Sequence, residues 1–149
     1  MTRLNLCLAM SLGLMTLCPS SSAAQDAPTK ARFDVTVIHA TQGEAEVDPA
    51  LETLSETLKT SFKDYQRFKK LLSRTKKPAQ GVPTKVKLPD GKTATFVFNG
   101  LDGGFIKVQF ELDGFKTQLR VRDGGLFFQA GRVYKGGILV LAVEAHAIP

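Results

Sequence analysis

Apolar and polar side chains alternate over residues 33–40, where Phe33, Val35, Val37 and His39 occupy every second position. A period of two, carried largely by β-branched residues, predicts a β-strand with one face turned toward a core. We therefore expect residues 33–40 to form the first strand and His39 to share its core-facing side.

The period changes to about 3.6 residues after position 48, which is typical of an amphipathic helix. An aspartate at this position can cap the free amides of a helix, and the proline that follows loses no hydrogen bond at the first helical position. The expected apolar stripe consists of Leu51, Leu54, Leu58 and Phe62. The sequence then predicts a short basic strand over residues 68–75.

Four Asp-Gly pairs divide the second half of the chain into short runs of strand-forming residues. They begin at Asp90, Asp102, Asp113 and Asp123. Aspartate and glycine tolerate the positive φ angles that tight turns require, so the pairs predict antiparallel strands joined in a meander. The strands we expect are 84–88, 93–99, 105–112, 115–122, 126–129 and 138–147.

The loop Asp113-Gly114 also predicts a register, because a loop of two residues determines which side chains lie opposite one another. Leu112 is then opposite Phe115, and Ile106 is opposite Val121. One face of this hairpin is apolar and the other is polar, as expected for a sheet that covers a core on one side.

These elements together predict an α+β domain. A curled antiparallel β-meander of about six to seven strands packs on one amphipathic helix, in strand-helix-strands order. The run ILVLAV at residues 138–143 is apolar on both faces. Such a strand is expected in the middle of a sheet or under cover on both sides.

The first 24 residues have the pattern of an export signal. Arg3 precedes an apolar run at residues 6–17, and small residues precede Gln25. The apolar run of 12 residues is too short to span a bilayer. We expect a cleaved signal peptide at residues 1–24, a flexible leader at 25–32 and a single α+β domain at 33–149. The protein is therefore expected to be exported, either to the periplasm or into the medium.

The residues that remain after cleavage restrict the possible chemistry. Both cysteines, Cys7 and Cys18, belong to the signal, so thiol catalysis and cysteine-based metal sites are excluded from the mature chain. The two histidines are His39 and His146, and no serine lies in a nucleophile elbow. We expect no enzymatic activity, no cofactor and no metal site.

A basic run is the most distinctive feature of the mature chain. Without Arg3, 19 lysines and arginines face 14 acidic residues, a net charge of +5. The candidate binding patch consists of Lys59, Lys63, Arg67, Lys69, Lys70, Arg74, Lys76 and Lys77. We expect these eight cations to gather at one end of the molecule and to attract an anionic partner. The alternative is a solvated edge strand, on which lysines prevent association between sheets.

The sequence thus predicts a small exported, non-enzymatic binding or assembly domain of the cell envelope or extracellular space. The expected partner is another envelope or extracellular protein or an anionic envelope component, and nucleic acid is not expected. Two alternatives are an exported protein or enzyme inhibitor that presents its glycine-rich loops, and a hydrolase that uses His39 with aspartate or glutamate partners.

Overall fold

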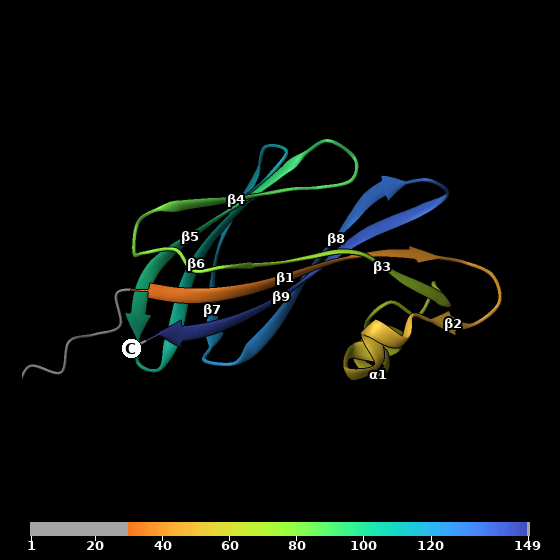
Figure 1. Cartoon of the computed structure of the whole chain (residues 1–149), viewed down its shortest axis with the longest axis horizontal. Helices are drawn as coiled ribbons and strands as arrows, with labels where there is room; N and C mark the ends of the chain where they lie inside the picture. The colour runs from red at the N-terminus through yellow and green to blue at the C-terminus, as the bar shows by residue number, and fades with distance from the viewer. Residues whose placement is uncertain (1–29, 149) are drawn as a thin grey trace, which may run out of the picture.

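The computed structural model describes residues 30–148 as two β-sheets with one short helical segment (Figure 1). The five-stranded sheet has the order β2-β3-β1-β9-β8, and the four-stranded sheet has the order β4-β5-β6-β7. The strands are β1 (Lys30–Thr41), β2 (Glu46–Val47), β3 (Arg67–Lys76), β4 (Pro83–Lys87), β5 (Thr93–Asp102), β6 (Phe105–Leu112), β7 (Phe115–Arg122), β8 (Gly125–Tyr134) and β9 (Gly137–Ile148). The signal peptide predicted at residues 1–24 lies outside the described residues.

The α+β class is confirmed in its coarse form, since the chain is mostly strand with one helical segment. The single curled sheet is not confirmed. A meander runs from β4 to β7, but the turn at Asp123-Gly124 then carries the chain into the other sheet, where β8 pairs with β9. This fourth Asp-Gly pair is therefore a crossing between sheets, whereas the other three join neighbouring strands of one sheet.

The predicted hairpin register is confirmed. Leu112 lies opposite Phe115 and Ile106 opposite Val121. Asp113 and Gly114 have φ angles of 50° and 81°, which are the positive values that this type of tight turn requires. The first strand is also confirmed, but it begins at Lys30, so residues 30–32 of the predicted leader are part of β1. Strand β9 lies inside its sheet, between β1 and β8.

The predicted helix is divided into a 3-10 segment, η1 (Pro49–Leu54), and a short α-helix, α1 (Ser55–Ser61). The carboxylate of Asp48 accepts a hydrogen bond from the Ala50 amide at 3.0 Å, as the capping pattern predicts. The same carboxylate accepts a bond from the Lys70 amide at 3.2 Å. The first turn is therefore attached to the edge of β3. Leu51 and Leu58 of the stripe are buried.

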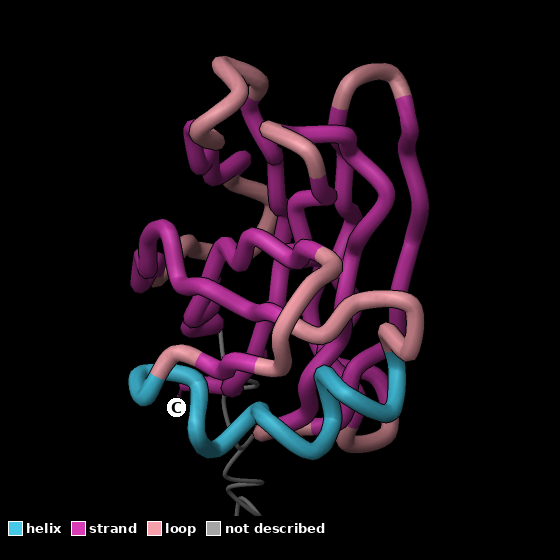
Figure 2. Tube along the Cα trace, turned by 90° about the vertical axis from the view of Figure 1, so that its right-hand side faces the viewer, coloured by secondary structure: helices cyan, strands magenta, loops and turns pink. Residues whose placement is uncertain are grey.

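Each face of the five-stranded sheet is covered along only part of its length. The four-stranded sheet packs on the face that bears Phe33, Val35 and Val37. The helical segment packs on the opposite face, near Ile38 and the end of β1, and Figure 2 shows it lying across one end of the strands. His39 points to the first of these faces but is only half-buried, because it lies beyond the part of β1 whose face packs in the core between the sheets.

Candidate functional site: a cationic row on β3

Strand β3 carries most of the predicted basic patch and forms an edge of its sheet. It pairs with β1 along its length, from Lys76 opposite Phe33 to Arg67 opposite Thr41. On its outer side, β2 pairs only with Arg67 and Phe68. Among residues 30–148, no strand pairs with the outer side of β3 beyond Phe68. Most of its charged side chains are thus exposed, and its outer backbone groups have no strand partner beyond Phe68, although the Lys70 amide donates to Asp48.

A β-bulge decides which face of β3 each cation occupies. Val37 lies opposite Leu72 and Ile38 opposite Lys70, so Leu71 is an extra residue on β3. Side chains that lie opposite one another share a face, and an extra residue reverses the alternation. Four cations therefore lie on the same face, which we call the cationic row: Arg67, Lys69, Arg74 and Lys76. In a regular strand the first two would lie on one face and the last two on the other.

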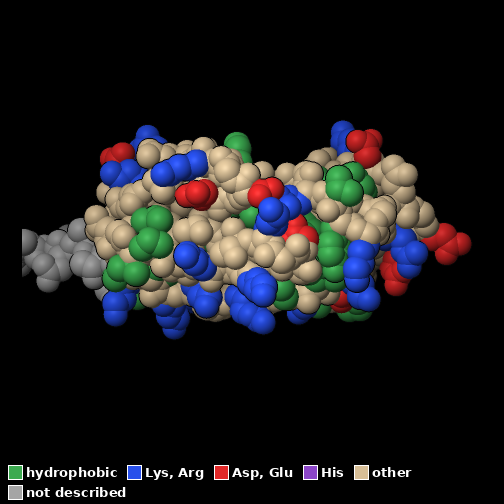
Figure 3. Space-filling view, turned by 90° about the horizontal axis from the view of Figure 1, so that it is seen from above, with side chains coloured by type: hydrophobic (Ala, Val, Ile, Leu, Met, Phe, Trp, Pro, Cys, Tyr) green, Lys and Arg blue, Asp and Glu red, His purple; other side chains and the backbone are tan. Residues whose placement is uncertain are grey.

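The row is extended, which differs from the expected cluster at one end. A strand rises about 3.3 Å per residue, so the ten residues of β3 cover about 30 Å. Lys70 lies on the opposite face, Lys59 belongs to α1, and Lys63 and Lys77 follow α1 and β3. Figure 3 likewise shows Lys and Arg side chains spread along the length of the molecule.

Most of the eight cations have no carboxylate partner. Arg67 is paired with Glu46 at 2.6 Å, and Lys59 with Glu56 at 3.5 Å. Arg74 donates to the backbone carbonyl of Ser73 at 2.9 Å. The other cations of the patch form no ion pair within the described part of the chain. These side chains therefore have no carboxylate within ion-pair distance among the described residues.

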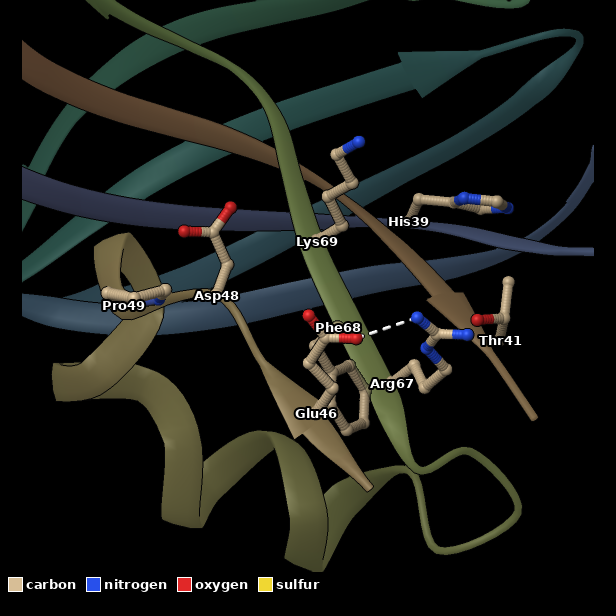
Figure 4. Close-up of a pocket in the computed structure, with 8 residues that line it drawn as sticks. All are labelled: His39, Thr41, Glu46, Asp48, Pro49, Arg67, Phe68 and Lys69. Atoms are coloured by element: carbon tan, nitrogen blue, oxygen red, sulfur yellow. Dashed lines mark hydrogen bonds and ion pairs between the residues drawn. The ribbon is translucent and has the colours of Figure 1, made fainter. Parts of the chain in front are cut away.

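A hollow of about 500 Å³ lies at the Arg67 end of the row. Figure 4 shows the guanidinium of Arg67 between the carboxylate of Glu46 and the side chain of Thr41, with His39 beyond. The lining residues are His39, Thr41, Glu46, Asp48, Pro49, Arg67, Phe68 and Lys69. The Thr41 hydroxyl, the Arg67 guanidinium and the Lys69 ammonium supply hydrogen-bond donors suited to an anionic group.

The carboxylates of this hollow already have structural partners. The hydrogen bond from the Ala50 amide lowers the pKa of Asp48. Desolvation opposes this effect, and the hydrogen bond from the Lys70 amide adds to it. Asp48 is thus ionised at neutral pH and held as a cap, and Glu46 is held by Arg67. Within residues 30–148, no three His, Cys, Asp or Glu side chains are arranged to hold a metal ion.

His39 is attached to the hairpin between β8 and β9. Its Nε2 lies 2.9 Å from the carbonyl oxygen of Tyr134 and is placed to donate to it. The two rings meet edge to face, with centroids 5.3 Å apart. No carboxylate in the described part of the chain forms an ion pair with His39. His146 lies in β9 and contacts Glu144 at 2.8 Å.

Comparison of the chain with protein-family models, with characterised proteins and with solved structures finds no match in any of the three. None of the helices in the described region combines the length and the apolar character needed to cross a membrane.

Proposed function

We propose that this chain is a small exported, non-enzymatic binding or assembly domain, which docks its cationic row onto an anionic component of the cell envelope or extracellular space. The observation that carries this function is the bulge at Leu71, which places four cations on one face of an edge strand. An alternating strand with the same residues would divide its charge between two faces.

The spacing of the row suits a partner with repeated negative charges. Arg67 and Lys69 are two residues apart, as are Arg74 and Lys76, so each pair spans about 7 Å. The two pairs lie near opposite ends of a strand about 30 Å long. A single small anion can neutralise one pair, whereas an anionic polymer or surface can neutralise both.

The hollow at the Arg67 end of the row is suited to bind one anionic group of the partner. Thr41 lies opposite Arg67 on the neighbouring strand, one position from Lys69 on the same face, so a hydroxyl donor and two cations face the same space. A carboxylate or phosphate group of the partner placed there receives charge-assisted hydrogen bonds, which are stronger than those between neutral groups.

The test compares two triple variants that lose the same charge. The row variant carries Lys69→Gln, Arg74→Gln and Lys76→Gln, and the control carries Lys59→Gln, Lys63→Gln and Lys70→Gln. Both are assayed by co-sedimentation with an isolated envelope fraction and with vesicles that contain an anionic lipid. The substituted side chains are exposed except for Lys76, which is half-buried and forms no ion pair within residues 30–148, so each change is expected to alter stability by less than about 0.5 kcal/mol.

We expect the row variant to lose association and the control to retain most of it. Association of the wild type should also weaken with added salt, since exposed charges are screened over about 8 Å at physiological ionic strength. Equal losses in the two variants would show that net charge alone matters. Retention of the row variant at every salt concentration would overturn the proposed role of β3.

Export is tested separately by mass spectrometry of the mature protein. The expected N-terminus is Gln25, because small residues at positions 22 and 24 precede it. Recovery of material that retains Met1 from the envelope or medium would contradict cleavage of the signal.

A second candidate function, an exported protein or enzyme inhibitor, is favoured by the β8–β9 hairpin. Figure 1 shows this hairpin extending away from the four-stranded sheet. Val133 near its tip is 82% exposed, and Lys135 and Gly136 form a tight turn with positive φ angles. A protruding apolar residue that is already held in its bound conformation lets an inhibitor bind with little loss of conformational entropy. Under this alternative, Val133→Asp should abolish capture of the target, while association through the cationic row is unchanged.

A further inference from the structure

Strand β8, at the opposite edge of the five-stranded sheet, differs from β3 in having no charge over residues 125–131. The sequence of this segment is GLFFQAG. In the described part of the chain, β8 pairs only with β9, so its other side has no neighbouring strand. An uncharged, apolar edge is the kind of edge that pairs with a further strand.

The other three edges carry the charges that normally prevent such pairing. Strand β3 has the cationic row and Lys70, and β4 has Pro83, Lys85 and Lys87. Strand β7 has Lys116, Arg120 and Arg122. Lysine and proline on an edge strand oppose association between sheets. The contrast identifies residues 125–131 of β8 as the one edge segment of this length among residues 30–148 without lysine, arginine or proline.

The side chains of β8 are also incompletely covered. All residues from Gly125 to Ala130 are half-buried. Leu126 and Phe128 pack partly against the helical segment, and Phe127 packs partly between the sheets. An open groove of about 320 Å³ lies between β7 and β8. Its lining is mostly apolar but includes two arginines of β7: Phe105, Leu119, Arg120, Val121, Arg122, Gly125, Leu126 and Phe127. A strand added beside β8 would cover this apolar surface.

We propose that β8 pairs antiparallel with β8 of a second copy of this chain, which forms a dimer with one continuous sheet across the two-fold axis. A two-fold interface places the same surface on both partners, so the surface must be compatible with itself. Residues 125–131 meet this condition because no like charges face each other. The same arrangement at β3, β4 or β7 would bring cations together.

The geometry also limits the size of the assembly. The regular part of β8 begins at Gly125 and ends at the bulge between Ala130 and Arg132. Pairing over this short segment joins two five-stranded sheets, and the outer edge of the resulting sheet is β3 in both copies, with β2 beside its first residues. Because that edge is cationic, the assembly closes as a dimer and does not extend into a fibre.

The test places one positive charge either in the uncharged segment of β8 or at a matched position on β7. Gln129→Lys places a cation in the uncharged segment, where the present side chain only approaches the neighbouring Ala130 carbonyl at 3.4 Å. Gln118→Lys makes the same change on β7, where Gln118 is exposed and cations are already present. Mass is measured by light scattering and analytical ultracentrifugation over a range of concentrations, and amide hydrogen exchange is recorded for β8. Thermal unfolding confirms that both variants are folded.

We expect the wild type and Gln118→Lys to dimerise and to protect the β8 amides. Gln129→Lys should weaken dimerisation by about tenfold or more, because cations of both copies then approach the two-fold axis. A monomeric wild type at all concentrations, or an equally tight Gln129→Lys dimer, would overturn the inference. The row variant described above should still dimerise, so failure of envelope docking and failure of β8 pairing are distinguishable.

Discussion

Arg132 on β8 donates from Nε to Oδ2 of Asp90 at 2.5 Å and thereby joins the two sheets. Its Nη1 also contacts Oδ2 of Asp113 at 2.9 Å. One side chain of the five-stranded sheet therefore binds two turns of the four-stranded sheet, the β4–β5 turn and the β6–β7 turn. The side chains of Arg132 and Asp90 are 24% and 12% exposed. Removing one partner from an ion pair shielded in this way destabilises the protein more than removing one partner from a surface pair does.

Arg132→Gln should destabilise the domain by about 1–3 kcal/mol, because Asp90 is left shielded from water without its charged partner. Urea denaturation measures the change. The matched control is Arg120→Gln, which breaks the pair with Asp102, whose side chains are 58% and 57% exposed. A surface pair contributes about 0–1 kcal/mol. Equal effects of the two substitutions would contradict the role of Arg132 as a link between the sheets.

The same network predicts a loss of stability in acid. Burial tends to raise the pKa of Asp90, but hydrogen bonds from Arg132 and the Lys92 amide outweigh it and lower the pKa overall. Hydrogen bonds from Lys92 and Arg132 lower the pKa of Asp113. A carboxyl group whose pKa is lowered in the folded state makes its full contribution to stability when the pH is above its unfolded-state pKa, about 3.9. That contribution is lost as the pH falls through the lower, folded-state pKa.

We therefore expect the free energy of unfolding to fall as the pH drops below about 4. The double variant Asp90→Asn, Asp113→Asn should be less stable at neutral pH but should lose less stability on acidification. Urea unfolding at a series of pH values measures both slopes. Parallel slopes for wild type and variant would show that these two carboxylates do not contribute to the acid sensitivity.

Leu58→Asp should unfold the domain or destabilise it by about 3–5 kcal/mol, because a charge without a partner enters the cluster beneath the sheet. Leu58 is fully buried between α1 and the strands. The control is Thr57→Asp at the exposed neighbouring position, with an expected change within about 0.5 kcal/mol. Thermal unfolding followed by circular dichroism compares them. An unchanged melting temperature for Leu58→Asp would show that this helix does not cover the core.

Gly114→Val should destabilise the β6–β7 hairpin by about 1–2 kcal/mol, since a β-branched residue resists the positive φ angle of 81°. A Cβ atom at this position would meet nothing within 4 Å, so the cost is one of backbone conformation and not of crowding. Gly114→Asn is the matched control, because asparagine tolerates this conformation better. Denaturant titration should rank wild type above Asn, and Asn above Val.

Features that depend on neighbouring residues in the chain were predictable from the sequence. The alternation of β1, the cap at Asp48 and the turn at Asp113-Gly114 all involve groups within a few residues of one another. Backbone preferences and local hydrogen bonds determine whether these elements form. The β6–β7 register followed in the same way, because a two-residue loop determines pairing along the whole hairpin. The basic character of β3 was likewise evident.

Only the tertiary structure decided how these elements meet. The turn at Asp123 resembles the other Asp-Gly turns in sequence, yet it leads from one sheet to the other. The bulge at Leu71 keeps Leu72 opposite Val37 and on the face that packs against the second sheet, and it therefore moves Arg74 and Lys76 to the face of Arg67 and Lys69. Arg132 reaches carboxylates 42 and 19 residues away in the chain. Such contacts depend on burial of distant apolar surfaces against one another, and this long-range packing has no signature in local periodicity.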